Sequence, residues 1–207
     1  MIKYILFTLL LLIFIRIILT IWWYYSPHTM LNLKYNTNLD ISKLKNNYLI
    51  ICSHKVPMTE IMIMCNELRK FKNKTNIVAW VDTKKINDKV DQFFKDLPIY
   101  THYNKINIDR YKKNGKTKEI ITKLKNDENV IVFLHEDSKS EGIYYLLKDI
   151  NIPILFTKIK LVEGNSDKQN LYKVFGNKYK VDYEKIDDYE ITESKKFMNY
   201  VKNKLYS

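Results

Sequence analysis

Short runs of β-branched and other apolar residues alternate with charged, helix-like stretches along most of this 207-residue chain. Each run is a few residues long, a length that suits a buried strand and is too short for a buried helix. The predicted strands are Tyr48–Cys52, Ile77–Val81, Ile106–Ile108, Val130–Leu134 and Ile154–Ile159. Strands that alternate with helices predict an α/β fold, in which helices flank a mostly parallel sheet.

The predicted helices lie between these strands and at the end of the chain. Apolar residues such as Ile120, Ile121 and Leu124 recur in them at three- to four-residue spacing, which is the pattern of a helix with one buried face. The helical stretches are Glu60–Phe71, Lys84–Asp96, Lys116–Asn126, Ile143–Asp149 and Ser194–Leu205. Residues 28–45 are expected to form a polar connector, and residues 172–181 a strand pair around Gly176.

The first 27 residues contain an almost unbroken apolar run from Tyr4 to Tyr25, interrupted by Arg16. As a helix this run would be roughly 33 Å long, enough to cross a bilayer. No small-residue cleavage site follows it, which favours a retained anchor over a removed signal peptide. The sequence therefore predicts a membrane anchor over residues 1–27, either a single transmembrane pass or a helix embedded in the membrane surface. Residues 28–207 are expected to form one α/β domain, and the lysines after the run favour a cytosolic position for it.

The composition excludes several other classes of function. The formal net charge of +12 comes mainly from lysines that are scattered along the chain, so membrane lipids are a better predicted partner than nucleic acid. No two of the four glycines have the spacing of a dinucleotide- or P-loop-type phosphate site. The two cysteines and four histidines form no cluster with zinc spacing, so neither a metal nor a cofactor is predicted. The oligomeric state is left open.

Two polar loops follow predicted strands at the places where α/β proteins commonly bind ligands. In the first loop, His54 is followed by Glu60, a pair that could act as a general base and its orienting carboxylate. The second loop, residues 135–142, offers hydroxyls, an ammonium and backbone N–H groups to a phosphate. Taken singly, either loop is also compatible with ordinary solvated structure.

The order of these segments resembles the four motif blocks of the glycerolipid acyltransferases, which include the 1-acyl-glycerol-3-phosphate acyltransferases. In that family the blocks read N-H-x-x-x-x-D, a segment ending in I-D-R, F-P-E-G-T-R-S and V-P-I-x-P. The corresponding segments here are Ser53–Glu60, Ile106–Arg110, Val132–Ser140 and Ile152–Leu155. The resemblance covers roughly residues 46–160, with similar spacing between the blocks.

The resemblance implies a membrane-bound enzyme that moves a fatty acyl group from a thioester carrier to a lysophospholipid. The implied co-substrate is acyl-CoA, and the implied acceptor is 1-acyl-glycerol-3-phosphate. His54 would be the general base, with Glu60 as the acid beside it. The acceptor phosphate would be bound by matching residues of the second and third blocks, namely Arg110, Glu136, Ser138, Lys139 and Ser140.

This chain also departs from the family pattern. Thr59 occupies the position of the family's acid, and Glu60 comes one residue later. In the third block, His135, Asp137 and Lys139 replace proline, glycine and arginine. The alternative function is therefore a catalytically impaired, membrane-anchored relative that binds lipids or acts as a scaffold. A Glu60 carboxylate within hydrogen-bond reach of the His54 ring would favour the enzyme.

Overall fold

The computed structural model describes residues 2–25, 32–45, 47–55, 57–81, 104–109, 116–148, 150–165, 176–191 and 193–207. The strands are β1 (Lys34–Thr37), β2 (Leu49–Ser53), β3 (Thr75–Val81), β4 (Asn104–Asp109), β5 (Asn129–Leu134), β6 (Ile154–Glu163) and β7 (Lys178–Ile186). The helices are α1 (Ile2–Tyr25), α3 (Pro57–Leu68), α5 (Thr117–Lys125), α6 (Gly142–Lys148) and α7 (Ser194–Tyr206), with a 3-10 turn, η1 (Ile41–Lys43).

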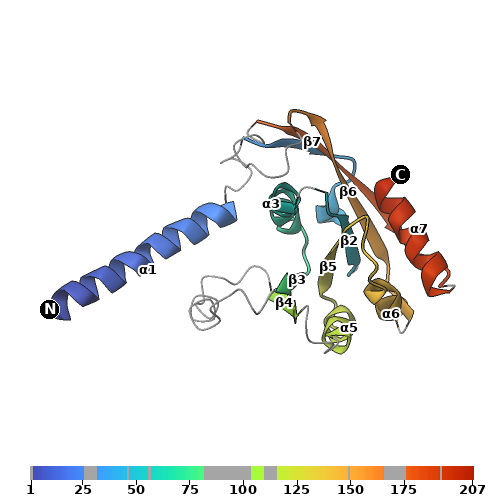
Figure 1. Cartoon of the computed structure of the whole chain (residues 1–207), viewed down its shortest axis with the longest axis horizontal. Helices are drawn as coiled ribbons and strands as arrows, with labels where there is room; N and C mark the ends of the chain where they lie inside the picture. The colour runs from blue at the N-terminus through green and yellow to red at the C-terminus, as the bar shows by residue number, and fades with distance from the viewer. Residues whose placement is uncertain are drawn as a thin grey trace.

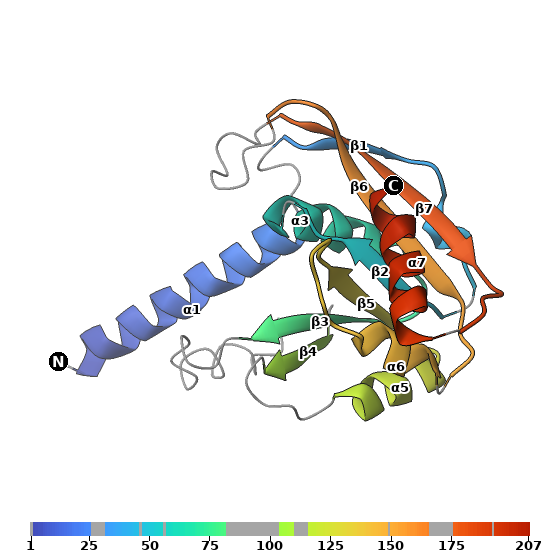
Figure 2. The same cartoon turned by 45° about the vertical axis from the view of Figure 1, so that its right-hand side comes forward.

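The described strands form one seven-stranded sheet in the order β1-β7-β6-β2-β5-β3-β4, seen between the helices in Figure 2. Every pairing in it is parallel except β6 with β7. The predicted α/β fold with a mostly parallel sheet is therefore confirmed. The strands from β2 to β6 all end at one edge, and β1 and β7 run in the opposite direction.

Helices cover both faces of the sheet, and β2 shows how its sequence supports this. Leu49 and Ile51 are buried in a core that includes α5, α6 and α7. The intervening Ile50 and Cys52 are buried in a second core with α3. Figure 1 shows α3 on the opposite side of the sheet from α7. Because successive side chains of a strand point to opposite faces, a strand buried on both faces is a continuous apolar run.

Most predicted elements form close to their expected bounds. The apolar face of the last helix is buried as expected, with Phe197, Val201 and Leu205 each at most 2% exposed. The predicted helix Lys84–Asp96 lies outside the described residues, as do residues 172–175 of the predicted strand pair. β7 begins at Lys178 and pairs with β6 and β1.

The prediction of a polar connector over residues 28–45 is wrong at β1, which pairs in parallel with β7. Its four residues are alternately exposed and half-buried, so they carry no apolar signal. Beyond β1, the side-chain amide of Asn38 continues the pairing. It donates to the Tyr183 carbonyl at 2.9 Å and accepts from the Tyr183 N–H at 2.7 Å. Main-chain bonding therefore defines this edge strand.

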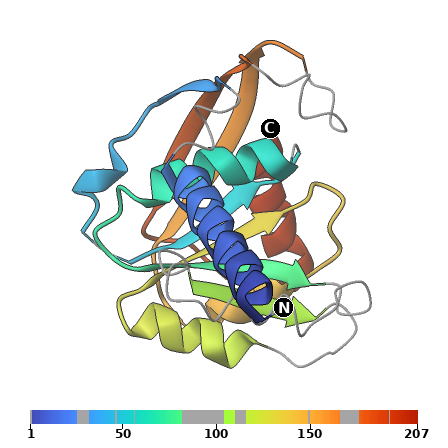
Figure 3. The same ribbon diagram turned by 90° about the vertical axis from the view of Figure 1, so that its left-hand side faces the viewer.

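The N-terminal apolar run forms helix α1, which extends away from the sheet on the side of α3 (Figure 3). Most of its described apolar side chains are exposed, among them Phe7 at 67% and Leu10 at 58%. Within the described ranges, no helix has both the length and the apolarity that crossing a bilayer requires. The predicted transmembrane pass therefore has no support in the structure.

Candidate functional site

The candidate site lies at the edge of the sheet where β2 and β5 end. The two strands pair in parallel with Ser53 opposite Leu134, so the residues that follow them, His54 and His135, leave the sheet side by side. Their ring centroids are 4.2 Å apart, in an edge-on arrangement. The sheet register thus brings together the first and third sequence blocks, which are about 80 residues apart along the chain.

Glu60 reaches the His54 ring from the first turn of α3, which begins at Pro57. One carboxylate oxygen, Oε2, lies 3.2 Å from His54 Nδ1. The other, Oε1, accepts the main-chain N–H of Lys55 at 2.8 Å. The Glu60 side chain is only 2% exposed and that of His54 15%. With Nδ1 held by the carboxylate, Nε2 is the ring nitrogen that can exchange a proton with a substrate.

Thr59, at the position of the family's acid, is buried and does not take part in this contact. Its hydroxyl has no hydrogen-bond partner among the described residues. The longer side chain of Glu60 makes the contact from the next position. The geometry expected of an intact histidine–carboxylate pair is therefore present, and the catalytic roles of His54 and Glu60 stay predictions.

The third-block loop after β5 folds on itself through hydrogen bonds. Ser138 N donates to the His135 carbonyl at 3.1 Å, Ser140 N to Ser138 Oγ at 3.2 Å, and Gly142 N to Ser140 Oγ at 3.3 Å. These three N–H groups are thus already used within the loop. The serine hydroxyl protons and the exposed Lys139 ammonium are side-chain donors that this loop can offer to an anion.

Of the two remaining predicted phosphate-binding residues, Glu136 is among the described residues and Arg110 is not. Glu136 lies in the same loop and is exposed, as is Asp137 beside it. Arg110 lies outside the described residues, directly after the end of β4. The structure therefore brings the first and third blocks together and leaves the placement of Arg110 as a prediction.

Tyr206 is a site residue that the sequence analysis missed. Its hydroxyl accepts the main-chain N–H of His54 at 3.1 Å and donates to the Leu134 carbonyl. It therefore bridges the ends of β2 and β5 where their ladder stops. The Lys55 ammonium lies 5.0 Å from the centre of the Tyr206 ring. Burial raises the pKa of the Tyr206 phenol to about 12, so the hydroxyl keeps its proton at neutral pH.

No group of three or more histidine, cysteine, aspartate or glutamate side chains in the described part of the chain is arranged to hold a metal ion. Cys52 is a free thiol with no exposed surface, at the end of β2. Burial, reinforced by the nearby Glu60 carboxylate, raises the pKa of this thiol well above its ordinary value. A protonated, buried thiol is a poor nucleophile and a poor metal ligand, so Cys52 contributes packing.

The structure is similar to the crystal structure of PlsC, the 1-acyl-sn-glycerophosphate (LPA) acyltransferase from Thermotoga maritima. The match has a TM-score of 0.54 and 18% sequence identity, and it covers 84% of this chain and 70% of that one. This is an acyltransferase-like fold. The fold that the motif blocks implied is therefore confirmed by a comparison of structures. No protein-family model and no curated protein sequence matches the chain.

Proposed function

We propose that this chain is an acyltransferase that moves a fatty acyl group from a thioester carrier to a lysophospholipid. The observation that carries the proposal is the pairing of His54 with the buried Glu60 carboxylate, at 3.2 Å, at the strand-end edge of an acyltransferase-like fold. The proposed donor is acyl-CoA, used as a co-substrate, and the proposed acceptor is 1-acyl-glycerol-3-phosphate.

In the proposed reaction, His54 Nε2 takes the proton from the free glycerol hydroxyl as that oxygen attacks the thioester carbonyl. Glu60 keeps the ring oriented through Nδ1 and stabilises the imidazolium that forms. When the tetrahedral intermediate collapses, the carbon–sulfur bond breaks and the carrier leaves as a thiolate. The imidazolium then returns its proton to the sulfur, so that an ester and a free thiol are formed. No acyl-enzyme intermediate is required.

The acceptor phosphate is proposed to bind on the β5 side of His54. The Lys139 ammonium and the hydroxyl protons of Ser138 and Ser140 are the proposed donors there, with Arg110 as a second cation. Glu136 is proposed to orient these groups from the same loop. A charge-assisted hydrogen bond to phosphate is roughly twice as strong as a neutral one, so binding the phosphate would fix the glycerol hydroxyl near Nε2.

Helix α1 is proposed to hold the protein at a membrane surface, as a monotopic anchor with the α/β domain in the cytosol. Most of its described apolar residues are exposed, and such a surface is stabilised when it is buried among lipid chains. The lipid acceptor would then be taken from the same membrane. The scattered lysines of the domain would add attraction to anionic lipids.

The decisive experiment compares wild type with His54→Ala in purified protein reconstituted with lipid vesicles. Mixed lysophospholipids and acyl-CoAs are supplied, and the products are identified by mass spectrometry. Removing a general base typically lowers the rate by about 10²–10⁴-fold. Circular dichroism establishes that the variant is folded. Unchanged acyl transfer by His54→Ala would falsify the mechanism.

A second candidate function is a lipid-binding or scaffolding relative without turnover. The exposed Asp137 carboxylate favours it, because a negative charge in the third-block loop repels a phosphate. The same experiment separates the two functions. Lysophospholipid binding without product from any offered acyl-CoA would identify the second one.

A further inference from the structure

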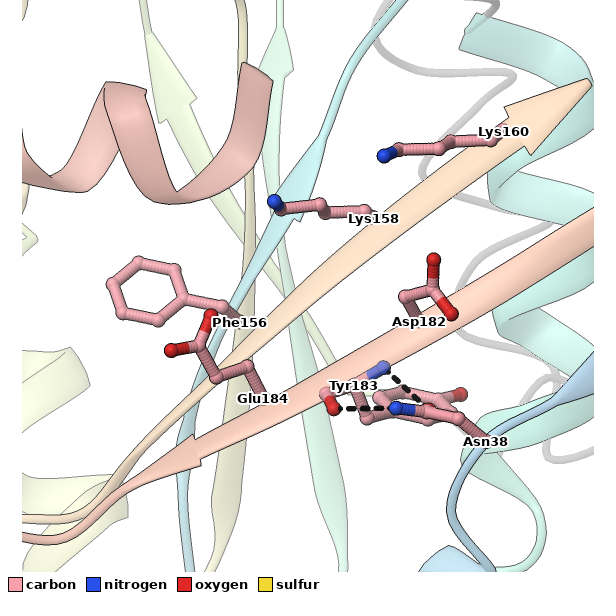
Figure 4. A pocket seen from close by; sticks show the side chains of 7 residues that line it. All are labelled: Asn38, Phe156, Lys158, Lys160, Asp182, Tyr183 and Glu184. Carbon is pink, nitrogen blue, oxygen red and sulfur yellow. Dashed lines mark hydrogen bonds between the residues drawn. The ribbon is translucent and has the colours of Figure 1, made fainter. Parts of the chain in front are cut away.

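A surface pocket of about 210 Å³ lies across β6 and β7 beside α7. Figure 4 shows the side chains that line it, which are Asn38, Phe156, Lys158, Lys160, Asp182, Tyr183 and Glu184. Two contacts place α7 next to the pocket. The Lys204 ammonium of α7 binds the Glu184 carboxylate, and Lys158 Nζ donates to a main-chain oxygen of Ser207, the residue after α7, at 3.4 Å.

The charges around this pocket do not balance. Asp182 is neutralised by Lys180 at 2.8 Å, and Glu184 by Lys204. Lys158 and Lys160, by contrast, pair with no aspartate or glutamate side chain among the described residues, although Lys158 contacts a main-chain oxygen of Ser207. They lie two positions apart on β6, so their side chains project from the same face of the strand, as Figure 4 shows. The pocket thus presents two ammonium groups that no aspartate or glutamate side chain neutralises.

The pocket adjoins the candidate site through Tyr206, the last residue of α7, and Ser207, which follows it. Tyr206 binds the main chain of His54, and the next residue, Ser207, binds Lys158. On β6, the residue between the two lysines donates its N–H to the Ser53 hydroxyl at 3.2 Å. The pocket therefore lies on the β6 side of His54, whereas the third-block loop lies on the β5 side.

We propose that Lys158 and Lys160 bind a phosphate group of the acyl donor's thiol carrier. This inference rests on the proposed function and adds a donor site to it. A transfer reaction needs two substrates to meet at one base, and the sheet order offers a cationic surface on each side of His54. The β5 side is assigned to the acceptor phosphate. The β6 side is then available to a phosphorylated thiol such as coenzyme A.

The test measures the binding of coenzyme A to the full-length protein by titration calorimetry. Coenzyme A carries a free thiol and no acyl group, so binding is observed without turnover. In Lys158→Ala/Lys160→Ala we expect the dissociation constant to rise about tenfold or more, which is the size expected from losing two ammonium–phosphate contacts. Lys158→Arg/Lys160→Arg should bind nearly as wild type, because the charge is kept. The matched control is Lys118→Ala, which removes an exposed lysine of α5 and should change nothing.

Pantetheine, which lacks phosphate, identifies the group that is recognised. Its binding should be the same in wild type and in the double alanine variant. An unchanged affinity of the double variant for coenzyme A would overturn the proposal, and so would an equal loss for pantetheine. A loss confined to lysophosphatidate or to anionic phosphatidylglycerol vesicles would also overturn it, because the phosphate would then belong to a lipid.

Failure of this inference is distinguishable from failure of the proposed function. If His54→Ala transfers acyl groups as wild type does, the mechanism is wrong, and a lysine-dependent affinity for coenzyme A still supports the donor site. If His54→Ala is inactive and the double alanine variant binds coenzyme A as wild type does, the proposed function stands and the donor site is wrong.

Discussion

Glu60 uses both of its carboxylate oxygens, one for the His54 ring and one for the Lys55 main chain. Glu60→Gln keeps the shape and removes the charge, so the imidazolium formed during transfer would lose its counter-ion. We expect the turnover rate to fall about 10–100-fold, as for the loss of a hydrogen bond to a charged group. Steady-state kinetics measures this rate. The control is Glu119→Gln, which changes a carboxylate of α5 that pairs with Lys116. Full activity of Glu60→Gln would remove the carboxylate from the mechanism.

Tyr206→Phe removes the hydroxyl that bridges the ends of β2 and β5. The His54 N–H and the Leu134 carbonyl would each lose a partner, and the histidine would be held less firmly. We expect turnover to fall severalfold while the Michaelis constant for the lysophospholipid stays the same, since an unmade hydrogen bond costs about 1–3 kcal/mol. Tyr200→Phe, on the same helix, is the control and should keep the wild-type rate. A rise in the Michaelis constant alone would contradict the positioning role.

The sequence identifies His54 and Glu60 because both belong to one short motif block. It does not identify Tyr206, which is 152 positions from His54. Tyr206 contacts the main-chain N–H of His54. Every residue except proline has such a group, so the type of residue at position 54 does not indicate this contact. Only the packing of α7 against the sheet brings the two together. Residues that position a site through backbone contacts are therefore the ones that a motif cannot reveal.

At the scale of elements, α1 is a helix whose apolar surface is mostly exposed. Leu6→Lys/Leu10→Lys places two charges one turn apart on one side of it, at positions that are 61% and 58% exposed. Each substitution replaces a leucine, whose burial among lipid chains is worth about 1.5–3 kcal/mol, with a charged group that is not stabilised there. We therefore expect at least a tenfold loss of vesicle binding in a flotation assay.

The domain does not depend on these two leucines, so its thermal unfolding should stay as in wild type. Lys118→Glu, on the exposed surface of α5, serves as a control for charge effects at the vesicle surface. Vesicle binding that is unchanged in the double lysine variant would rule out α1 as the anchor.

Strand β6 carries a buried hydroxyl, that of Thr157, which has no partner among the described residues. Thr157→Val replaces this hydroxyl with a methyl group of similar size and favours the strand conformation. We expect the free energy of unfolding to rise by about 1 kcal/mol, because a buried polar group without a partner is removed. Urea unfolding measures the change. Thr75→Val is the contrasting variant: its hydroxyl contacts Asn73 and Asn129, so it should not be stabilising.

The elements that the sequence predicts are those whose side chains enter a core. Strands β2 and β5 and the first half of β6 are apolar because helices cover the sheet there, and α7 has a regular apolar face. β1 is different, because its place in the sheet depends on main-chain hydrogen bonds to β7 and on the Asn38 amide. The order of the strands is likewise not encoded in any one of them. It follows from how the helices connect them.

At the scale of the whole molecule, stability should depend on alkaline pH. Burial raises the pKa of Tyr206 to about 12 and raises the pKa values of Tyr35 and Tyr183 above their ordinary value of 10.0. Above pH 10 the unfolded chain releases these phenolic protons more readily than the folded chain does. The folded state then binds more protons, so the free energy of unfolding falls as pH rises.

We therefore expect the urea midpoint to be steady between pH 7 and 8 and to decline from about pH 9, where the Cys52 thiol of the unfolded chain begins to lose its proton, towards pH 12. In Tyr206→Phe the decline should be shallower, because one of the contributing phenols is absent. A midpoint that is constant through pH 11 would show that these phenols are not protected by folding.

The pairing of β1 with β7 has a consequence for how the protein is made. Lys34 pairs with Lys178, so the first strand of the sheet can pair with its neighbour only after the residues around Lys178 have been synthesised. The anchor of His54 comes later still, since Tyr206 follows His54 by 152 positions. Domains fold from the N-terminus as they are made, and contacts between distant residues form late. The histidine emerges from the ribosome well before Tyr206, so its backbone is held in place only after Tyr206 has been synthesised.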